Sequence, residues 1–184
     1  GGAGMTKEEV KQHAVKFCEE YGVDSYPVPI VQLCNNRGLQ VFEEYLSSEV
    51  SGIIMVDETN MNKELYKKYG CNKFIVVNLV ENAMRRRFTI AHELAHYELH
   101  SNGGSYIAHR DTTNGVVKSR TEREADLFAT NVLMPEWLVR QAAQDMKLNY
   151  RGKIPNFLLV SLMAEQFIVS KQAMEIRLRE LSII

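Results

Sequence analysis

Apolar and polar positions alternate along the chain in patterns that predict its helices and strands. Over residues 6–21 the apolar positions recur at helical spacing. Thr6 stands at the start of this run, Glu9 follows three residues later and Gly22 comes after the end, which predicts an N-cap with a capping box and a C-terminal stop. A shorter pattern of the same kind predicts a second helix over residues 30–36.

Three short segments have the apolar runs typical of β-strands. They are residues 39–42, 52–56 and 73–79. The last is apolar almost throughout, which indicates a strand buried on both faces. Residues 60–69 leave open whether they form a helical turn. We therefore expect a small sheet in the first half of the chain.

A long helix is predicted around residues 87–100, because helix formers dominate there and no Pro or Gly occurs between Val80 and Asn102. Its apolar residues fall on two flanks of a helical wheel, so most of the helix should be buried. His92 and His96 lie on the arc between these flanks. Buried histidines need partners for their ring nitrogens, and a metal ion can be one of them.

His92 and His96 are four residues apart and share one face of the predicted helix. Imidazole nitrogens at this spacing can bind one Zn²⁺. Glu93, between them, is then placed to act as a general base on a zinc-bound water rather than to bind the metal. In the alternative interpretation the pattern occurs by chance, with a core histidine and a solvated glutamate.

A catalytic zinc has three protein ligands and one open position, so the third ligand should come from another element. The helical segment at residues 121–135 offers Glu122 and Glu124. Glu122 lies on the small and apolar face, so we expect it to face the metal, and we expect Glu124 to point outward. Asp126 shares the face of Glu122 and can accept the second ring N–H of a ligand histidine. Acids that only complement the helix dipole are the alternative.

These two motifs resemble those of the ImmA/IrrE family of zinc metallopeptidases. The likeness is carried by residues 87–100 and 122–135, and it extends upstream to residues 51–54 and 74–78. Ala95 stands where the family often has Gly, which is a small departure. The resemblance therefore covers most of the chain.

The resemblance implies a zinc metallopeptidase with an α+β fold and a thermolysin-like zincin core, in which a small twisted sheet lies in front of the active-site helix. It implies that His92, His96 and Glu122 ligate Zn²⁺ and that Glu93 is the general base. Many members cleave, or otherwise relieve, a helix-turn-helix repressor encoded nearby. A protein substrate of this kind is the expected partner.

Composition narrows the class of protein. A chain of 184 residues with 45% hydrophobic content suits one globular domain, or a core with a small helical subdomain. The formal charge of −1 argues against a dominant nucleic-acid surface, and no apolar run approaches the roughly 18 residues of a membrane span. Cys18, Cys34 and Cys71 are odd in number and lack ligand spacing, so we interpret them as free thiols in a reducing cytoplasm.

The chain divides into three parts on this interpretation. Residues 1–4 are taken as a remnant of an expression tag, residues 5–135 as the metallopeptidase core and residues 136–184 as a helical C-terminal subdomain. Two helical patterns meet at Val169 and Ser170, with Ser170 as an N-cap, and resemble a helix-turn-helix. The second of these helices carries acids as well as bases, which favours protein packing or partner recognition over DNA contact.

Residues 101–119 are polar and rich in Gly, Asn and Thr, which predicts a long irregular loop. His100, just before it, lies about two turns after His92, and we expect it beside the ligands rather than on the metal. The loop carries three side chains able to donate to a developing oxyanion, although a plain surface loop accounts for them equally well. These are Tyr106, His109 and Arg110.

Two functions of other classes stay open at this stage. One is a non-catalytic regulator, in which a structural metal closed by a fourth ligand accompanies a surface that holds a repressor or DNA. The other is a toxin-like partner of a small antitoxin. An intact Glu93 favours catalysis, because a purely structural metal site has no use for a base.

Overall fold

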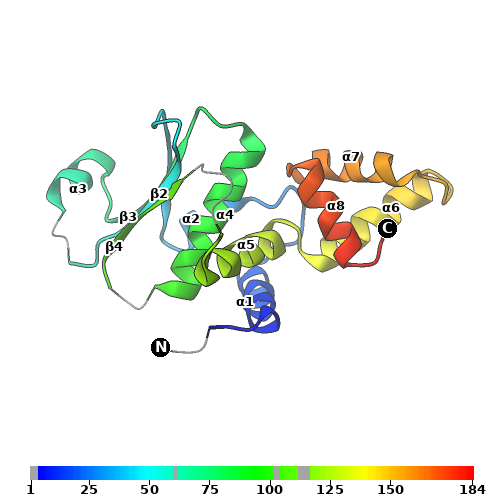
Figure 1. Ribbon diagram of the computed structural model, residues 1–184, viewed down its shortest axis with the longest axis horizontal. Coiled ribbons are helices and arrows are strands. Elements are labelled where there is room, and N and C mark those ends of the chain that lie inside the picture. The colour runs from blue at the N-terminus through cyan, green and yellow to red at the C-terminus, as the bar shows by residue number, and fades with distance from the viewer. Residues whose placement is uncertain (1–3, 60–61, 102–103, 112–116) are drawn as a thin grey trace.

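A sheet of four strands forms one layer of the fold (Figure 1). The computed structural model describes residues 4–59, 62–101, 104–111 and 117–184, with the side chains of residues 109–111 left out. Across the sheet the order is β1-β3-β2-β4, in which β1 and β3 are parallel and the other two pairs are antiparallel. The strands are β1 (Gln40–Glu44), β2 (Val50–Val56), β3 (Lys73–Asn78) and β4 (Tyr106–Asp111).

The fourth strand corrects the expectation of an irregular loop over residues 101–119. In β4, Tyr106 lies opposite Val56 and Ala108 lies opposite Ile54. β4 is an edge strand, so its regularity comes from pairing with β2 alone and not from a strong apolar pattern of its own. The amino-acid composition of residues 101–119 therefore does not predict β4.

The first helix, α1 (Lys7–Glu20), begins as predicted. The Thr6 hydroxyl accepts the Glu9 N–H at 3.1 Å, and the Glu9 carboxylate accepts the Thr6 N–H at 3.3 Å, which completes the capping box. The second helix, α2 (Ile30–Asn36), is also confirmed. Within the undecided residues 60–69 the structure has α3 (Lys63–Tyr69).

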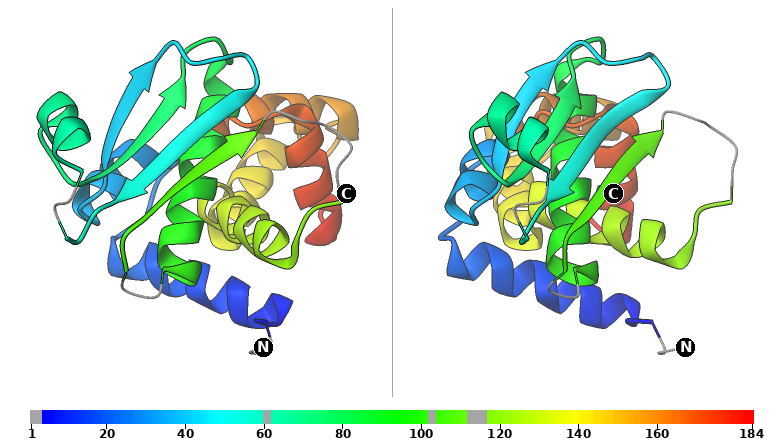
Figure 2. Two further views of the ribbon diagram at one scale, coloured as in Figure 1. Left: turned by 60° about the vertical axis from the view of Figure 1, so that its left-hand side comes forward. Right: turned by 90° about the vertical axis from the view of Figure 1, so that its left-hand side faces the viewer.

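Helix α4 (Ala83–His100) packs on one face of the sheet, and Leu65 and Tyr69 of the short α3 pack against part of the other face (Figure 2). Alternate side chains of β2 and β3 enter the main core with α4, as the two-residue period of a strand requires. Gly52 on β2 permits this close approach. A Cβ atom there would lie 2.6 Å from the Thr89 Cγ2 atom and 3.1 Å from the Val76 carbonyl oxygen.

Helix α5 (Arg120–Leu133) packs between α4 and α1. Three further helices gather at one end of the molecule (Figure 1). They are α6 (Glu136–Asn149), α7 (Asn156–Phe167) and α8 (Lys171–Glu180).

The two helices expected on either side of Val169 and Ser170 are confirmed as α7 and α8. Ser170 caps α8 by accepting the Ala173 N–H at 3.0 Å. The buried guanidinium of Arg177 ties α8 to the end of α5. It donates to the Met134 carbonyl at 3.0 Å and to the Asn131 side-chain oxygen at 3.1 Å.

The three cysteines are free thiols, of which Cys18 and Cys34 are buried. Burial raises the pKa of each of these two thiols to about 12, so they stay protonated at neutral pH. Within the described residues, no helix combines the length and the apolar character that crossing a bilayer requires.

Candidate metal centre

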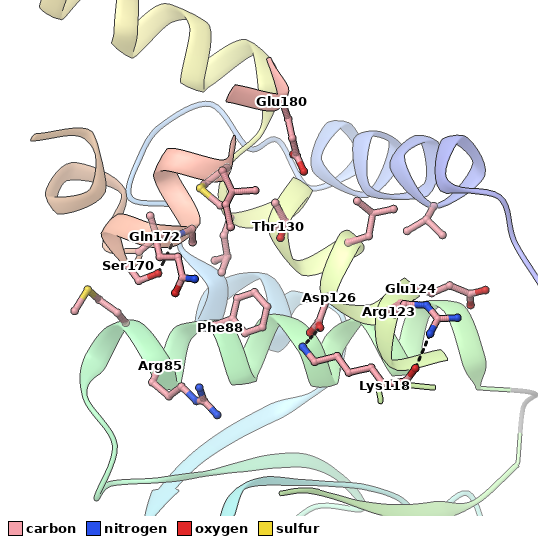
Figure 3. A pocket seen from close by; sticks show the side chains of 18 of the residues that line it. Arg85, Phe88, Lys118, Arg123, Glu124, Asp126, Thr130, Ser170, Gln172 and Glu180 are labelled. Carbon is pink, nitrogen blue, oxygen red and sulfur yellow. Dashed lines mark hydrogen bonds and ion pairs between the residues drawn. The ribbon is translucent and has the colours of Figure 1, made fainter. Parts of the chain in front are cut away.

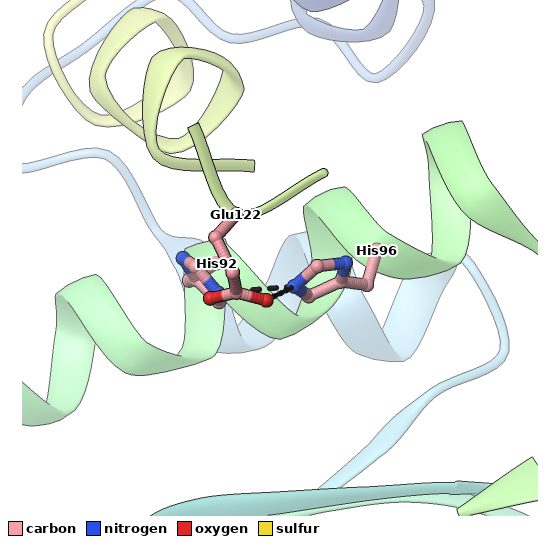
Figure 4. Close-up of side chains that lie close together, drawn as sticks. All are labelled: His92, His96 and Glu122. Atoms are coloured by element: carbon pink, nitrogen blue, oxygen red, sulfur yellow. Dashed lines mark hydrogen bonds and ion pairs between the residues drawn. The ribbon is translucent and has the colours of Figure 1, made fainter. Parts of the chain in front are cut away.

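The side chains of His92, His96 and Glu122 meet between α4 and α5 (Figure 4). The Glu122 carboxylate oxygens lie 2.9 Å from the His92 Nε2 atom and 2.8 Å from the His96 Nε2 atom. The two Nε2 atoms are 3.1 Å apart. The helical spacing in α4 aligns the histidines, and Ser119 starts α5 so that Glu122 falls in its first turn.

These three side chains fit a single zinc ion. Ligand atoms held at about 2.0–2.2 Å from a tetrahedral zinc lie roughly 3.3–3.6 Å from one another, so the observed spacings would widen by roughly 0.2–0.8 Å. Both imidazoles direct Nε2 to the same point, which a cation between them accounts for. Two nitrogens and one carboxylate are also a ligand set of catalytic zinc enzymes.

The cluster is buried on the histidine side and open on the glutamate side. His92 is 1% exposed, whereas 40% of the Glu122 side chain is exposed. Hydrogen bonds from His92 and His96 hold the pKa of the Glu122 carboxyl well below its usual range. Glu122 is therefore a carboxylate at neutral pH, and solvent or a substrate can reach it.

The Asp126 carboxylate supports His92 from behind. One oxygen lies 2.8 Å from the His92 Nδ1 atom, and the other pairs with Lys118. Burial raises the pKa of Asp126, but the hydrogen bonds from His92 and Lys118 outweigh it and leave the pKa lowered. A carboxylate at Nδ1 keeps the proton on that nitrogen, so Nε2 is the atom that gives up its proton when a metal binds.

His96 is supported through a second histidine. Its Nδ1 atom lies 2.9 Å from the His100 Nδ1 atom, and the His100 Nε2 atom lies 2.8 Å from a Glu124 oxygen. With the His96 Nε2 atom on a metal, its Nδ1–H donates to His100, and His100 in turn donates to Glu124. His100 thus lies beside the three clustered side chains and outside the cluster, as expected from its spacing to His92.

The outward position expected for Glu124 is wrong. Glu124 is 7% exposed, and it also accepts the Met5 N–H at 3.2 Å. Its face of α5 has polar neighbours such as Asn131, but that face is covered by the fold, and Asn131 is buried too. Polarity did not indicate exposure here, because the partners of Glu124 come from distant parts of the chain.

Glu93 is 2% exposed and follows His92 on α4, outside the cluster of three. Tyr106 on β4 lies near it. Burial, followed by the charge of Glu93, raises the pKa of the Tyr106 hydroxyl well above its usual range. That oxygen is buried and makes no hydrogen bond within the described part of the chain, so it is a neutral donor without a partner there. The side chains of His109 and Arg110 lie outside the described residues.

Comparison with known proteins finds a matching peptidase family and two relatives from Bacillus and one of its phages. Residues 34–179 match the peptidase family described as the IrrE N-terminal-like domain. An "Uncharacterized immunity region protein 2" of Bacillus phage phi105 is 36% identical over 120 residues, which are 62% of this chain and 75% of that protein. "Metallopeptidase ImmA" of Bacillus subtilis (strain 168) is 30% identical over 67 residues, 36% of this chain and 38% of that protein.

Proposed function

Since the chain belongs to the IrrE N-terminal-like domain family of peptidases, we propose that it is a zinc-dependent endopeptidase that cleaves a helix-turn-helix transcriptional repressor. The family and the ImmA relative indicate a metallopeptidase. One observation carries the finer proposal. Three zinc-type ligand atoms of His92, His96 and Glu122 lie within 4.8 Å of one another, beside the buried carboxylate of Glu93.

His92, His96 and Glu122 would hold the zinc. When bound, zinc acidifies the attacking water and polarises the scissile carbonyl. Asp126 and the pair His100 and Glu124 fix the ring orientation and tautomer of the two histidines, so that both Nε2 atoms are ready to bind.

Glu93 moves the proton. Its carboxylate removes a proton from the attacking water, and the same group delivers that proton to the nitrogen of the leaving amine. Glu93 suits this role because it lies next to a ligand histidine without belonging to the ligand cluster. Its burial excludes competing solvent and strengthens its interaction with the developing charges.

Tyr106 is the donor that we assign to the oxyanion of the tetrahedral intermediate. The hydroxyl is protonated at neutral pH, as tyrosine hydroxyls ordinarily are, and burial followed by the charge of Glu93 raises its pKa further. The lack of a partner for this buried hydroxyl among the described residues supports a role toward substrate. His109 and Arg110 stay predictions from the sequence.

The repressor as substrate rests on the family resemblance and on the character of the relatives. One relative is named for the immunity region of a phage and the other is named a metallopeptidase. A repressor acts in the cytoplasm, which agrees with three cysteines that form no disulfide. We further assign residues 5–135 to a thermolysin-like core and residues 136–184 to a helical subdomain.

The test first asks whether a helix-turn-helix repressor is encoded beside this gene, as the proposal expects, and then uses that repressor. The two purified proteins are incubated with zinc, and fragments are identified by mass spectrometry. We expect one or a few defined cleavages, which disappear with a chelator and return when zinc is added. Cleavage that persists unchanged in the chelator, or an intact repressor under all conditions, would refute the proposal.

A further inference from the structure

A cavity of about 830 Å³ lies beside the candidate metal centre, where the starts of α1 and α4 and the lengths of α5 and α8 surround it (Figure 3). We propose that this cavity, called the α5 groove below, binds an acidic amphipathic segment of a partner protein. Both cationic and apolar side chains line it, among them Arg85, Phe88, Lys118, Arg123, Leu127 and Ile176.

The groove adjoins the metal centre without containing it. None of the three clustered side chains lines the groove, but Asp126 does, and Asp126 is bonded to His92 at 2.8 Å. The ring of Phe88 also lines the groove, and its centroid lies 6.4 Å from that of the His92 ring. A segment held in the groove would thus be anchored one side chain away from the reacting region.

The groove offers an apolar surface to its occupant. Phe88 and Leu127 are half-buried along it, and Ile176 on α8 is 51% exposed at its rim. Met84, 40% exposed, adds a flexible apolar side chain at the start of α4. Apolar side chains gathered around a concave surface are typical of a groove that receives the apolar face of an amphipathic helix.

The charges around the groove favour an acidic occupant. Five lysines and arginines line it against three acids. Two of these acids, Glu124 and Asp126, are already bonded to His100 and His92, and Glu180 lies on α8. The side chains of Arg85, Lys118 and Arg120 are 41%, 59% and 55% exposed, and they pair with Glu81, Asp126 and Glu124 respectively. The lining as a whole keeps an excess of two positive charges, five against three, which attracts an incoming carboxylate. The first turns of α4, α5 and α8 add the positive ends of three helix dipoles.

A protein segment fits these features better than duplex DNA. A phosphate backbone gains nothing from the apolar side chains of Phe88, Leu127 and Ile176. The first turn of α8, with Ser170 and Gln172, borders the same groove and faces α4 across it (Figure 3). The helix that would enter a DNA groove in a helix-turn-helix therefore opens onto the metallopeptidase core.

The test measures binding of labelled designed peptides to the full chain carrying Glu93→Gln, so that the probes are not cleaved. The acidic probe is a helix of about 18 residues, or five turns, with Leu along one face and Glu elsewhere. The control probe has Lys in place of every Glu. We expect the acidic probe to bind at least about tenfold more tightly than the basic one, with an affinity that falls as salt is raised.

Charge reversal locates the binding surface. The double substitution Arg85→Glu and Arg123→Glu should lower the affinity for the acidic probe at least about tenfold. Arg140→Glu with Arg179→Glu is the matched control, because it makes the same change of charge at two exposed arginines that do not line the groove. Ile176→Ser should also lower the affinity for the acidic probe, because it removes apolar contact without any change of charge. Melting temperatures verify that each variant is folded.

Three results would overturn the inference: equal affinity for both probes, equal losses in the groove and control variants, or displacement of the acidic probe by a DNA duplex. The inference rests on the proposed function only in taking the partner to be the substrate. Binding is therefore measured with and without zinc. Intact binding without cleavage of the repressor refutes the proposed function alone, and zinc-dependent cleavage without probe binding refutes the groove alone.

Discussion

Asp126 and His92 are joined by a hydrogen bond of 2.8 Å that crosses from α5 to α4. The same helix, α5, provides Glu122 to the cluster, so one turn of helix carries both a proposed ligand and the support of a second proposed ligand. The centre therefore depends on how α4 and α5 pack, and several of its residues can be tested separately.

Asp126→Asn should lower zinc affinity by about 10–100-fold, because an amide accepts the His92 Nδ1–H less strongly than a carboxylate and leaves the ring less basic. Competition with a metal chelator measures this. Lys118→Met is the control, since it removes the outer partner of Asp126 and keeps the bond to His92. Equal losses in both variants would mean that the ion pair, and not the bond to His92, matters.

Substitutions at Glu122 and Glu124 should both lower zinc affinity, but by different amounts. Glu122→Gln removes a charged ligand and should remove most of the zinc. Glu124→Gln should lower zinc affinity by about tenfold, because it weakens the support that reaches His96 through His100. Elemental analysis and chelator competition separate the two, with the exposed Glu136→Gln as a variant that should change nothing. Full zinc affinity in Glu124→Gln would show that the chain of bonds through His100 has no effect on the metal.

Glu93→Gln separates chemistry from binding. The amide keeps the size of the side chain but cannot take a proton, so repressor cleavage should fall by about 10²–10⁴-fold while zinc and repressor binding persist. If this variant still inactivates the repressor fully, the protein is a non-catalytic regulator that acts by holding its partner. If the variant loses zinc, Glu93 has a role at the metal.

Tyr106→Phe should lower kcat by about 10²–10³-fold with little change in KM, because the hydroxyl acts on charge that appears only in the transition state. Zinc content should be unchanged. The folded protein should be no less stable, since the hydroxyl is buried without a hydrogen bond in the described structure. A rise in KM at constant kcat would instead place Tyr106 in ground-state binding.

Gly52→Ala should destabilise the fold by about 1–3 kcal/mol, because its methyl group would overlap Thr89 where α4 crosses β2. Urea unfolding measures the loss. Gly104→Ala is the matched control, since a Cβ atom there meets nothing within 4 Å. Adding Thr89→Ser removes the methyl group that is met at 2.6 Å and should recover part of the stability. No recovery would place the strain at the Val76 carbonyl.

The features that could be predicted from the sequence are those that depend only on contacts within a single helix. The spacing of His92 and His96 and the capping box of Thr6 and Glu9 depend only on helical geometry, and the structure has both. The burial of Glu124 depends on His100 and Met5, which lie far away in the chain. β4 likewise depends on its pairing with β2. Neither could be read from local composition.

Helix α5 is held at both ends. At its start the Glu122 carboxylate contacts His92 and His96. Past its end the Arg177 guanidinium donates a hydrogen bond to the Met134 carbonyl. A helix of 14 residues is about 21 Å long and stiff, so a displacement at one end of α5 is passed on to the other end. Contacts at both ends oppose sliding and rotation of α5. We expect that removing Arg177 would loosen the candidate metal centre from the far end of α5, although no atom of α8 belongs to the cluster of His92, His96 and Glu122.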